Sequence, residues 1–303
     1  GSIFLNAPES LTHLRAAPPA NIAAAALASQ PLRTLLEGRE ARGDYGWTLG
    51  ILPTAALARH AGLSPAQYAR QVVRACFLDA AAPVAEWRRI HRRAGRIKRW
   101  LDGLPVGGFH VESATTDLVV PLGARRRWAG VSGRNIPSFE LFVSPDWRGV
   151  RGVFSADQPS FRSGNRVRGV RLEFREGRVV RLHAAEGEPF LRQQLGLDAG
   201  AAQVGEFSLT DRRFSRIDRF MANTLFDENY GGRFGNCHLA LGSSYADTYA
   251  GDPRRLSAAL KARLGFNRSA LHWDFVNTEK KRVTAVLSDG TRRVIYENGE
   301  FAR

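Results

Sequence analysis

Cysteine is scarce in this chain of 303 residues, which contains only Cys76 and Cys237. Two cysteines can form at most one disulfide, so a fold held by several disulfides is excluded, and these two lie far apart in the sequence. We expect both thiols to be reduced, as is usual for proteins inside cells. The scarcity also excludes a structural zinc site built from several thiolates.

Long apolar runs are also lacking. The longest lies at residues 21–28, is mostly alanine, and is too short to span a bilayer. Nothing at the start of the chain resembles a signal peptide, and the sequence opens with Gly1-Ser2 rather than Met. We therefore expect a cytoplasmic protein without a membrane partner, whose sequence begins inside a longer first domain.

Acidic residues are outnumbered, with 29 Asp and Glu against 44 Lys and Arg, which gives a net charge of +15. Such an excess can indicate nucleic acid, an anionic surface or acidic ligands as partners. It also arises from a GC-rich genome, because arginine greatly outnumbers lysine. Residues 83–101 show the bias best: apolar residues recur at helical spacing, and arginines fill the other faces. No aromatic platform interleaves with them, so we interpret these faces as solvated and do not expect a nucleic-acid partner.

The first third of the chain alternates between strand and helix patterns. Residues 3–7 and 46–52 have the apolar character of strands, the second of them buried. Residues 21–37 are helical in character. Helices at 54–60 and 64–77 each begin with a Thr or Ser that can cap them. This alternation predicts an α/β layer.

From residue 107 onward the patterns are those of β-structure. We predict strands at 111–121, 149–156 and 167–174, a hairpin at 173–183 that turns at Glu176-Gly177, and a helix at 189–195. Residues 282–301 contain two further turns and predict a β meander. The predicted fold is therefore α/β, with an N-terminal α/β region at residues 1–106 that lacks its first part. A mixed, β-rich domain follows at residues 107–303, with the boundary near 104–108.

Histidines and carboxylates lie within several of the short apolar segments. His272 and Asp274 are two apart in a strand-like run, so their side chains share one face and can converge on one ion. His238 also lies in an apolar strand pattern, and its neighbour Cys237 points to the opposite face. This alternation argues against a Cys-His dyad.

Glu140 and Glu206 likewise begin or enter apolar segments. Two glutamates, two histidines and an aspartate form a mixed oxygen and nitrogen set, which suits divalent ions of the zinc, cobalt or manganese type. Taken alone, His272 and Asp274 would more often be a polar strand face, His238 a core histidine, and Glu140 and Glu206 plain surface glutamates. The acidic segment 226–229 looks like a turn, where capping is a sufficient explanation.

Several phrases of the sequence, in this order, resemble the thermophilic aminopeptidases of the M29 metallopeptidase family. They are TDLVV (116–120), NIPSFELFVSPD (135–146), GEFSL (205–209), TLFDEN (224–229), CHLALG (237–242), Tyr245, NRSALHWDF (267–275), SDGT (288–291) and ENGE (297–300). They extend over most of the chain.

The resemblance implies a metal-dependent aminopeptidase that acts on peptides, is a homodimer and holds two divalent metal ions, with residues 107–303 as its catalytic domain. By motif, the family's metal ligands fall on Glu140, Glu206, His238, His272 and Asp274. The family's catalytic tyrosine falls on Tyr245. Glu206, as a carboxylate near the attacking water, is the candidate for moving its proton.

The sequence also departs from the family's pattern. Residues 230–235 form a longer and more glycine-rich link, polar residues follow Phe275, and Phe139 precedes the first glutamate. These departures leave open a family member that binds peptides or small amines without catalysis, or a hydrolase of another amide. A nucleic-acid binder driven by the positive charge is a further alternative.

Overall fold

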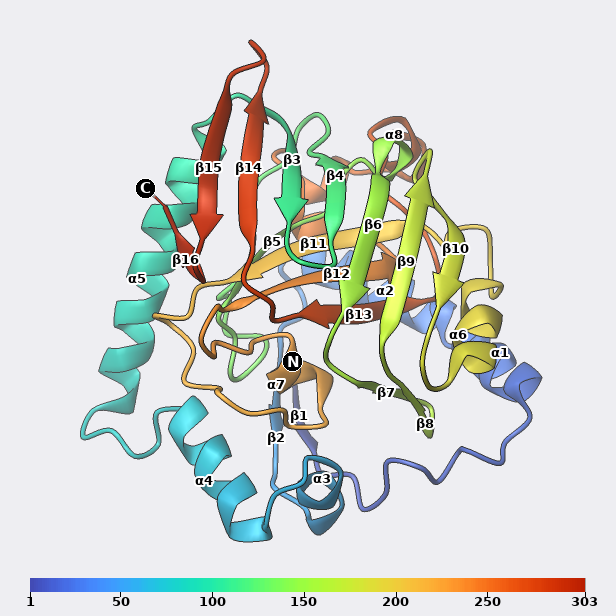
Figure 1. The fold of residues 1–303 in the computed structure, drawn as a ribbon, viewed down its shortest axis with the longest axis vertical. Coiled ribbons are helices and arrows are strands. Elements are labelled where there is room, and N and C mark those ends of the chain that lie inside the picture. The colour runs from blue at the N-terminus through green and yellow to red at the C-terminus, as the bar shows by residue number, and fades with distance from the viewer. Residues whose placement is uncertain (303) are drawn as a thin grey trace.

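Two antiparallel sheets form the centre of the computed structural model, which describes residues 1–302 (Figure 1). The larger contains β3 (Val106–Glu112), β4 (Asp117–Pro121), β6 (Arg151–Ala156), β9 (Val170–Arg175), β10 (Arg178–His183), β14 (Arg282–Leu287), β15 (Arg292–Glu297) and β16 (Glu300–Phe301). Its strand order is β10-β9-β6-β4-β3-β14-β15-β16. The smaller contains β5 (Glu140–Val143), β11 (Val204–Thr210), β12 (Asn236–Gly242) and β13 (His272–Asn277), in the order β13-β12-β11-β5. Its strands run across those of the larger sheet in Figure 1.

Aromatic side chains pack between the two sheets. Phe109 of β3 stacks on Phe207 of β11 with ring centroids 5.4 Å apart, and Trp128 packs edge-on against both. Burying each such ring contributes about 1.5–3 kcal/mol. All seven residues of β11 and of β12 are buried, so these central strands are covered on both faces.

The N-terminal part confirms the predicted alternation of strands and helices. It contains β1 (Ser2–Asn6), α1 (Pro19–Ala28), α2 (Gln30–Ala41), β2 (Trp47–Ile51), α3 (Ala55–His60), α4 (Pro65–Ala75) and α5 (Pro83–Asp102). β1 and β2 pair in parallel. Thr54 caps α3, and Ser64 forms a capping box with Gln67 at the start of α4. The predicted burial of β2 was wrong, because only Ile51 is fully buried.

Helix α5 runs along the β15–β16 edge of the larger sheet (Figure 1). Ile90, Ala94, Ile97 and Leu101 are buried on its inner face, as the helical spacing predicted. None of the helices in residues 1–302 combines the length and the apolar character that crossing a membrane requires.

Two predicted strands are each interrupted. The expected strand at 111–121 is the hairpin β3–β4, because the Ser113 amide donates to the Thr116 carbonyl and closes a turn. The expected strand at 167–174 breaks at Gly169, whose φ of 63° lies in the left-handed region. The hairpin at Glu176-Gly177 and the C-terminal meander are confirmed. The remaining elements are η1 (Trp147–Gly149), β7 (Ser160–Arg162), β8 (Asn165–Val167), α6 (Glu188–Leu195), α7 (Thr224–Asp227), η2 (Ala246–Thr248), η3 (Pro253–Arg255) and α8 (Ala258–Arg263).

Candidate metal centre

The smaller sheet brings all five predicted ligands to one face. Each of its four strands contributes: Glu140 begins β5, Glu206 lies in β11, His238 lies in β12, and His272 and Asp274 lie in β13. The register explains why they share a face. Ser208, two residues after Glu206, is paired with His238, and Thr210 is paired with Glu140. Ala240, two residues after His238, is paired with both Glu206 and Asp274.

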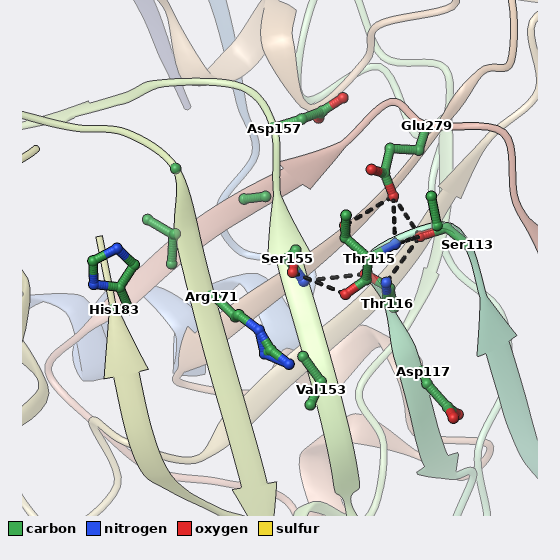
Figure 2. A pocket seen from close by; sticks show the side chains of 14 residues that line it. Ser113, Thr115, Thr116, Asp117, Val153, Ser155, Asp157, Arg171, His183 and Glu279 are labelled. Carbon is green, nitrogen blue, oxygen red and sulfur yellow. Dashed lines mark hydrogen bonds between the residues drawn. The ribbon is translucent and has the colours of Figure 1, made fainter. Parts of the chain in front are cut away.

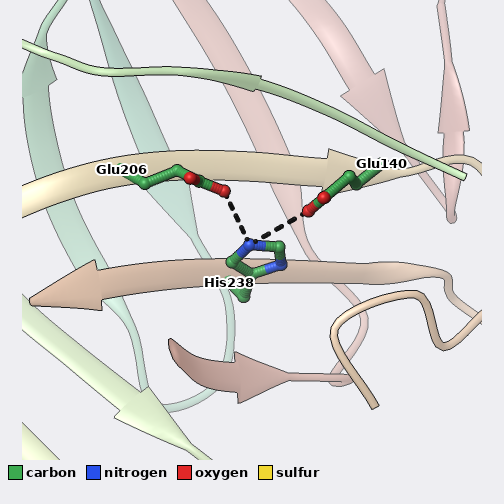
Figure 3. A group of neighbouring side chains, drawn as sticks. All are labelled: Glu140, Glu206 and His238. Atoms are coloured by element: carbon green, nitrogen blue, oxygen red, sulfur yellow. Dashed lines mark hydrogen bonds and ion pairs between the residues drawn. The ribbon is translucent and has the colours of Figure 1, made fainter. Parts of the chain in front are cut away.

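The side chains converge on the His238 imidazole (Figure 3). Its Nε2 lies 3.0 Å from Glu206 Oε1, 3.3 Å from Glu140 Oε2 and 3.9 Å from Asp274 Oδ1. One donor atom from each of Glu140, Glu206 and His238 lies within 4.8 Å of the others, a spacing that a metal ion can span.

The second imidazole continues the cluster. His272 Nε2 lies 3.4 Å from Asp274 Oδ1 and 3.8 Å from Glu206 Oε2. The two oxygens of Glu206 therefore face different histidines. His272 Nδ1 lies 2.8 Å from the Ser243 carbonyl oxygen, which fixes the ring and leaves Nε2 free to face the carboxylates. His238 Nδ1 has no such partner within residues 1–302.

The cluster is almost sealed from solvent. The side chain of His238 is 1% exposed, that of Glu206 4%, that of Asp274 9% and that of His272 18%. Burial and the neighbouring Glu206 raise the pKa of Glu140 to about 8. Burial alone lowers the pKa of each imidazole, but the surrounding carboxylates outweigh it and raise both to about 9. So many buried carboxylates destabilise one another unless cations neutralise them, and this donor set fits divalent metal ions.

Neighbouring polar groups hold the ligands in place. Ser208 Oγ donates to Glu140 Oε2 at 3.3 Å, and Asn229 Oδ1 accepts the Glu140 amide at 3.1 Å. Arg162 Nη1 donates to the His272 carbonyl at 2.8 Å. Such supporting contacts fix the ligand orientation before a metal binds.

Tyr245 lies at the rim of the cluster. Its ring centroid is 4.6 Å from that of His272, and it also packs edge-on against Phe142. The residue is 44% exposed, so part of its side chain reaches solvent beside the cluster.

Glu228 is a member of the site that the sequence did not reveal. It is only 8% exposed, and burial, followed by the charges of Glu140, Asp274 and Glu206, raises the pKa of its carboxyl well above the usual range. The capping interpretation of segment 226–229 holds for Asp227, which accepts the amides of Met221 and Asn223. For Glu228 it was wrong. No spacing rule distinguishes the two carboxylates before the fold is known.

A surface groove of about 600 Å³ lies on the larger sheet and is not lined by any of the five proposed ligands (Figure 2). Its carboxylates already have partners. Glu279 accepts from Ser113, Thr115 and Asn277, and Asp157 accepts from Thr278. We interpret this groove as a network that joins loops.

Comparison with known proteins agrees with the geometry. The thermophilic metalloprotease (M29) pattern matches residues 1–301, so the chain belongs to this metallopeptidase family, as the sequence predicted. It is 30% identical over 244 residues to aminopeptidase AmpS of Bacillus subtilis, covering 77% of this chain and 58% of that protein. It is 29% identical over 272 residues to aminopeptidase T of Thermus thermophilus, covering 84% of this chain and 63% of that protein.

Among solved structures, AmpT from Thermus thermophilus matches with a TM-score of 0.81 and 28% identity, covering all of this chain and 77% of that one. The predicted α/β fold class is thereby confirmed. The chain spans about three-fifths of the length of the relatives it matches in sequence.

Proposed function

We propose that this chain carries the catalytic centre of a metal-dependent aminopeptidase. The observation that supports this most strongly is the convergence of Glu140, Glu206, His238, His272 and Asp274 on one buried sheet face. A family of metalloproteases and relatives named aminopeptidases agree with it. The substrates would be peptides with a free N-terminus.

The five ligands would hold two divalent ions of the zinc, cobalt or manganese type. Each histidine has carboxylate oxygens of Glu206 and Asp274 within 4 Å, so each proposed ion would find both nitrogen and oxygen ligands. When bound, the ions would lower the pKa of a water molecule and polarise the scissile carbonyl.

The remaining chemistry falls to the chain's own side chains. Glu206 would accept a proton from the attacking water at one carboxylate oxygen and return it to the leaving amine. Tyr245 would donate its hydroxyl proton in a hydrogen bond to the tetrahedral oxyanion, a contribution of about 3 kcal/mol for one such donor.

The assembly and the division of the chain are also part of the proposal. We propose a cytoplasmic homodimer in which residues 1–106 form an N-terminal region and residues 107–303 form the catalytic domain. We propose no nucleic-acid partner, because within residues 1–302 the arginines of α5 are not accompanied by a series of exposed aromatic rings on which successive bases could stack.

The test is the release of N-terminal amino acids from a mixed set of short peptides. Protein reloaded with cobalt, zinc or manganese is compared with protein held in chelator, and bound metal is measured by mass spectrometry. We expect metal-dependent release of single residues, lost in Glu206→Gln. Glu176→Gln provides a matched control, because Glu176 is exposed and lies in a turn that contains none of the proposed ligands. Two bound metals without any release would contradict catalysis and favour a binding protein or a hydrolase of another amide.

A further inference from the structure

A second cavity, of about 450 Å³, lies between α5 and the segment at residues 131–138. It is separate from the large groove on the sheet and is not lined by the five proposed metal ligands. Its volume is that of a site for a small molecule. Its apolar lining, its two arginines and its fixed wall together indicate the class of ligand that it would bind.

Part of the lining is apolar. Val84, which is 63% exposed, lines the cavity together with Trp87, Val131 and Ile136. The Trp87 ring stacks on Phe139, with centroids 5.4 Å apart and planes inclined by 11°. Its Nε1 donates to a backbone carbonyl at 3.2 Å, so the indole has no freedom to swing into the space. A flat apolar group can therefore lie against a preformed surface.

The rim carries uncompensated positive charge. Arg88 and Arg92 are four residues apart on α5, so both project from one side of the helix, and both line the cavity. Within residues 1–302 neither forms an ion pair or a hydrogen bond to an acidic side chain. Their neighbour Arg89 does, at 2.8 Å from Glu86. Two free guanidinium groups at the mouth of an apolar cavity favour a carboxylate, which they can bind through paired N–H donors.

The opposite wall is held in place by α5 itself. His91 Nδ1 lies 3.2 Å from the Val131 carbonyl oxygen, and Lys98 Nζ donates to the Gly130 carbonyl at 2.8 Å. Val131 has a φ of 51°, an unfavourable backbone conformation for a β-branched residue that persists only where surrounding contacts enforce it. The cavity therefore exists before a ligand arrives, which reduces the entropic cost of binding.

Polar groups on that wall add further recognition. Ser132, Asn135 and Ser138 line the cavity and can bond to the amide of a peptide. Asn135 Nδ2 also lies 3.5 Å from Glu228 Oε1, so a residue that lines the cavity contacts a carboxylate near the metal cluster.

We infer that this cavity is a binding site for a carboxylate attached to an apolar group, with the apolar part against Trp87 and the carboxylate on Arg88 and Arg92. Two sources present this chemistry: the C-terminal residue of a peptide, and a free apolar acid. A zwitterionic amino acid fits less well, because its ammonium group would lie beside the two arginines. The inference does not depend on the proposed peptidase activity.

The test measures binding calorimetrically, with the protein kept in chelator so that the metal cluster does not contribute. The probe is N-acetyl-phenylalanine, and its C-terminal amide serves as the uncharged comparison. We expect the acid to bind at least tenfold more tightly than the amide. The double variant Arg88→Gln/Arg92→Gln should remove that preference, whereas Arg96→Gln/Arg99→Gln should keep it. The second pair loses the same charge from the same helix, is exposed and lies outside the cavity.

Three results would overturn the inference: no binding of the acid, equal binding of acid and amide, or equal losses in the two double variants. The two sources are separated by 3-phenylpropanoate and Gly-Gly-Phe. Tighter binding of the tripeptide identifies a peptide C-terminus that uses the amide-binding wall. Equal or tighter binding of 3-phenylpropanoate identifies a free acid.

Discussion

At the scale of single residues, the buried charges of the cluster have partners of opposite charge, whereas one buried lysine in the core has no hydrogen-bond partner in the part of the chain that the structure describes. Glu206 and His238 lie 3.0 Å apart, and each has a partner of opposite charge. Lys281, which is 3% exposed, has no hydrogen-bond partner for its Nζ within residues 1–302. A paired buried charge can be retained at modest cost, whereas an isolated one destabilises the fold.

Replacing Tyr245 with Phe tests the role of the phenol at the rim. Loss of one oxyanion donor should lower turnover by about 10²–10³-fold. Bound metal should stay unchanged, because the hydroxyl is not among the proposed ligands. Tyr249, which is 2% exposed and packs in a separate small cluster, supplies the control Tyr249→Phe. Unchanged turnover in Tyr245→Phe would remove the phenol from the mechanism.

Replacing Lys281 with Met should stabilise the protein by about 1–3 kcal/mol at pH 7, because an ammonium without a hydrogen-bond partner among the described residues is removed from a buried site. Burial lowers the pKa of Lys281 to about 8 in the folded state, from an ordinary value near 10.5. Below pH 8 the folded protein therefore bears the whole cost of the buried charge. Between about pH 8 and 10.5 the folded state releases the proton while the unfolded state retains it, so the wild-type free energy of unfolding rises with pH.

The advantage of Lys281→Met should accordingly shrink as the pH is raised from 7 to 10. Urea unfolding midpoints at both pH values measure it. The neighbouring Lys280 is exposed, so Lys280→Met is the matched control and should have almost no effect. A destabilised Lys281→Met variant would indicate that the ammonium has a partner after all.

At the scale of elements, the sequence predicted the features that depend on neighbouring residues, such as which strand side chains share a face and where helices begin. His272 and Asp274 share a face because strand side chains alternate, and that is visible in the sequence. The starts of α3 and α4 could also be predicted from the sequence, because Thr54 and Ser64 are residues that cap helices. The turn at residues 113–116 was missed, because its Ser and Thr residues also suit a strand and only the hydrogen bond between Ser113 and Thr116 reveals the chain reversal.

Ser64→Ala tests the capping box of α4. The variant loses the 3.2 Å bond from the Gln67 amide to Ser64 Oγ and should lower the free energy of unfolding by about 1 kcal/mol. Ser64→Asp keeps an acceptor at the same place and should remain close to wild type. Equal unfolding midpoints for Ser64→Ala and wild type would show that the cap makes no net contribution.

At the scale of the whole molecule, the order of strands in the sheets was beyond prediction from sequence patterns. β14 follows β13 in the chain but joins the other sheet beside β3, and β5 pairs with β11 across about 60 intervening residues. The five proposed ligands were predicted through the family resemblance, which indicates residues but not distances. Neither the sequence patterns nor the family resemblance predicted Glu228, because only the packed fold brings it towards Glu140.

Removing metal should destabilise the entire protein, because an ion that binds only the folded state stabilises it by mass action. At a free ion concentration 100 times the dissociation constant the gain is about 2.7 kcal/mol. Thermal unfolding with and without zinc or cobalt measures this shift. His238→Gln should lose most of the gain, and His183→Gln, which alters an exposed histidine of β10, should keep it. Equal shifts in both variants would place the ion elsewhere.

The position of β13 at the edge of the smaller sheet has a consequence for biosynthesis. During translation, Glu140 and Glu206 are synthesised well before His272 and Asp274. The latter two residues join the sheet only when β13 pairs with β12. Long-range pairings of this kind form slowly and late in folding. A nascent chain therefore cannot bring the five proposed ligands together until residues 272–274 have been synthesised and β13 has joined the sheet.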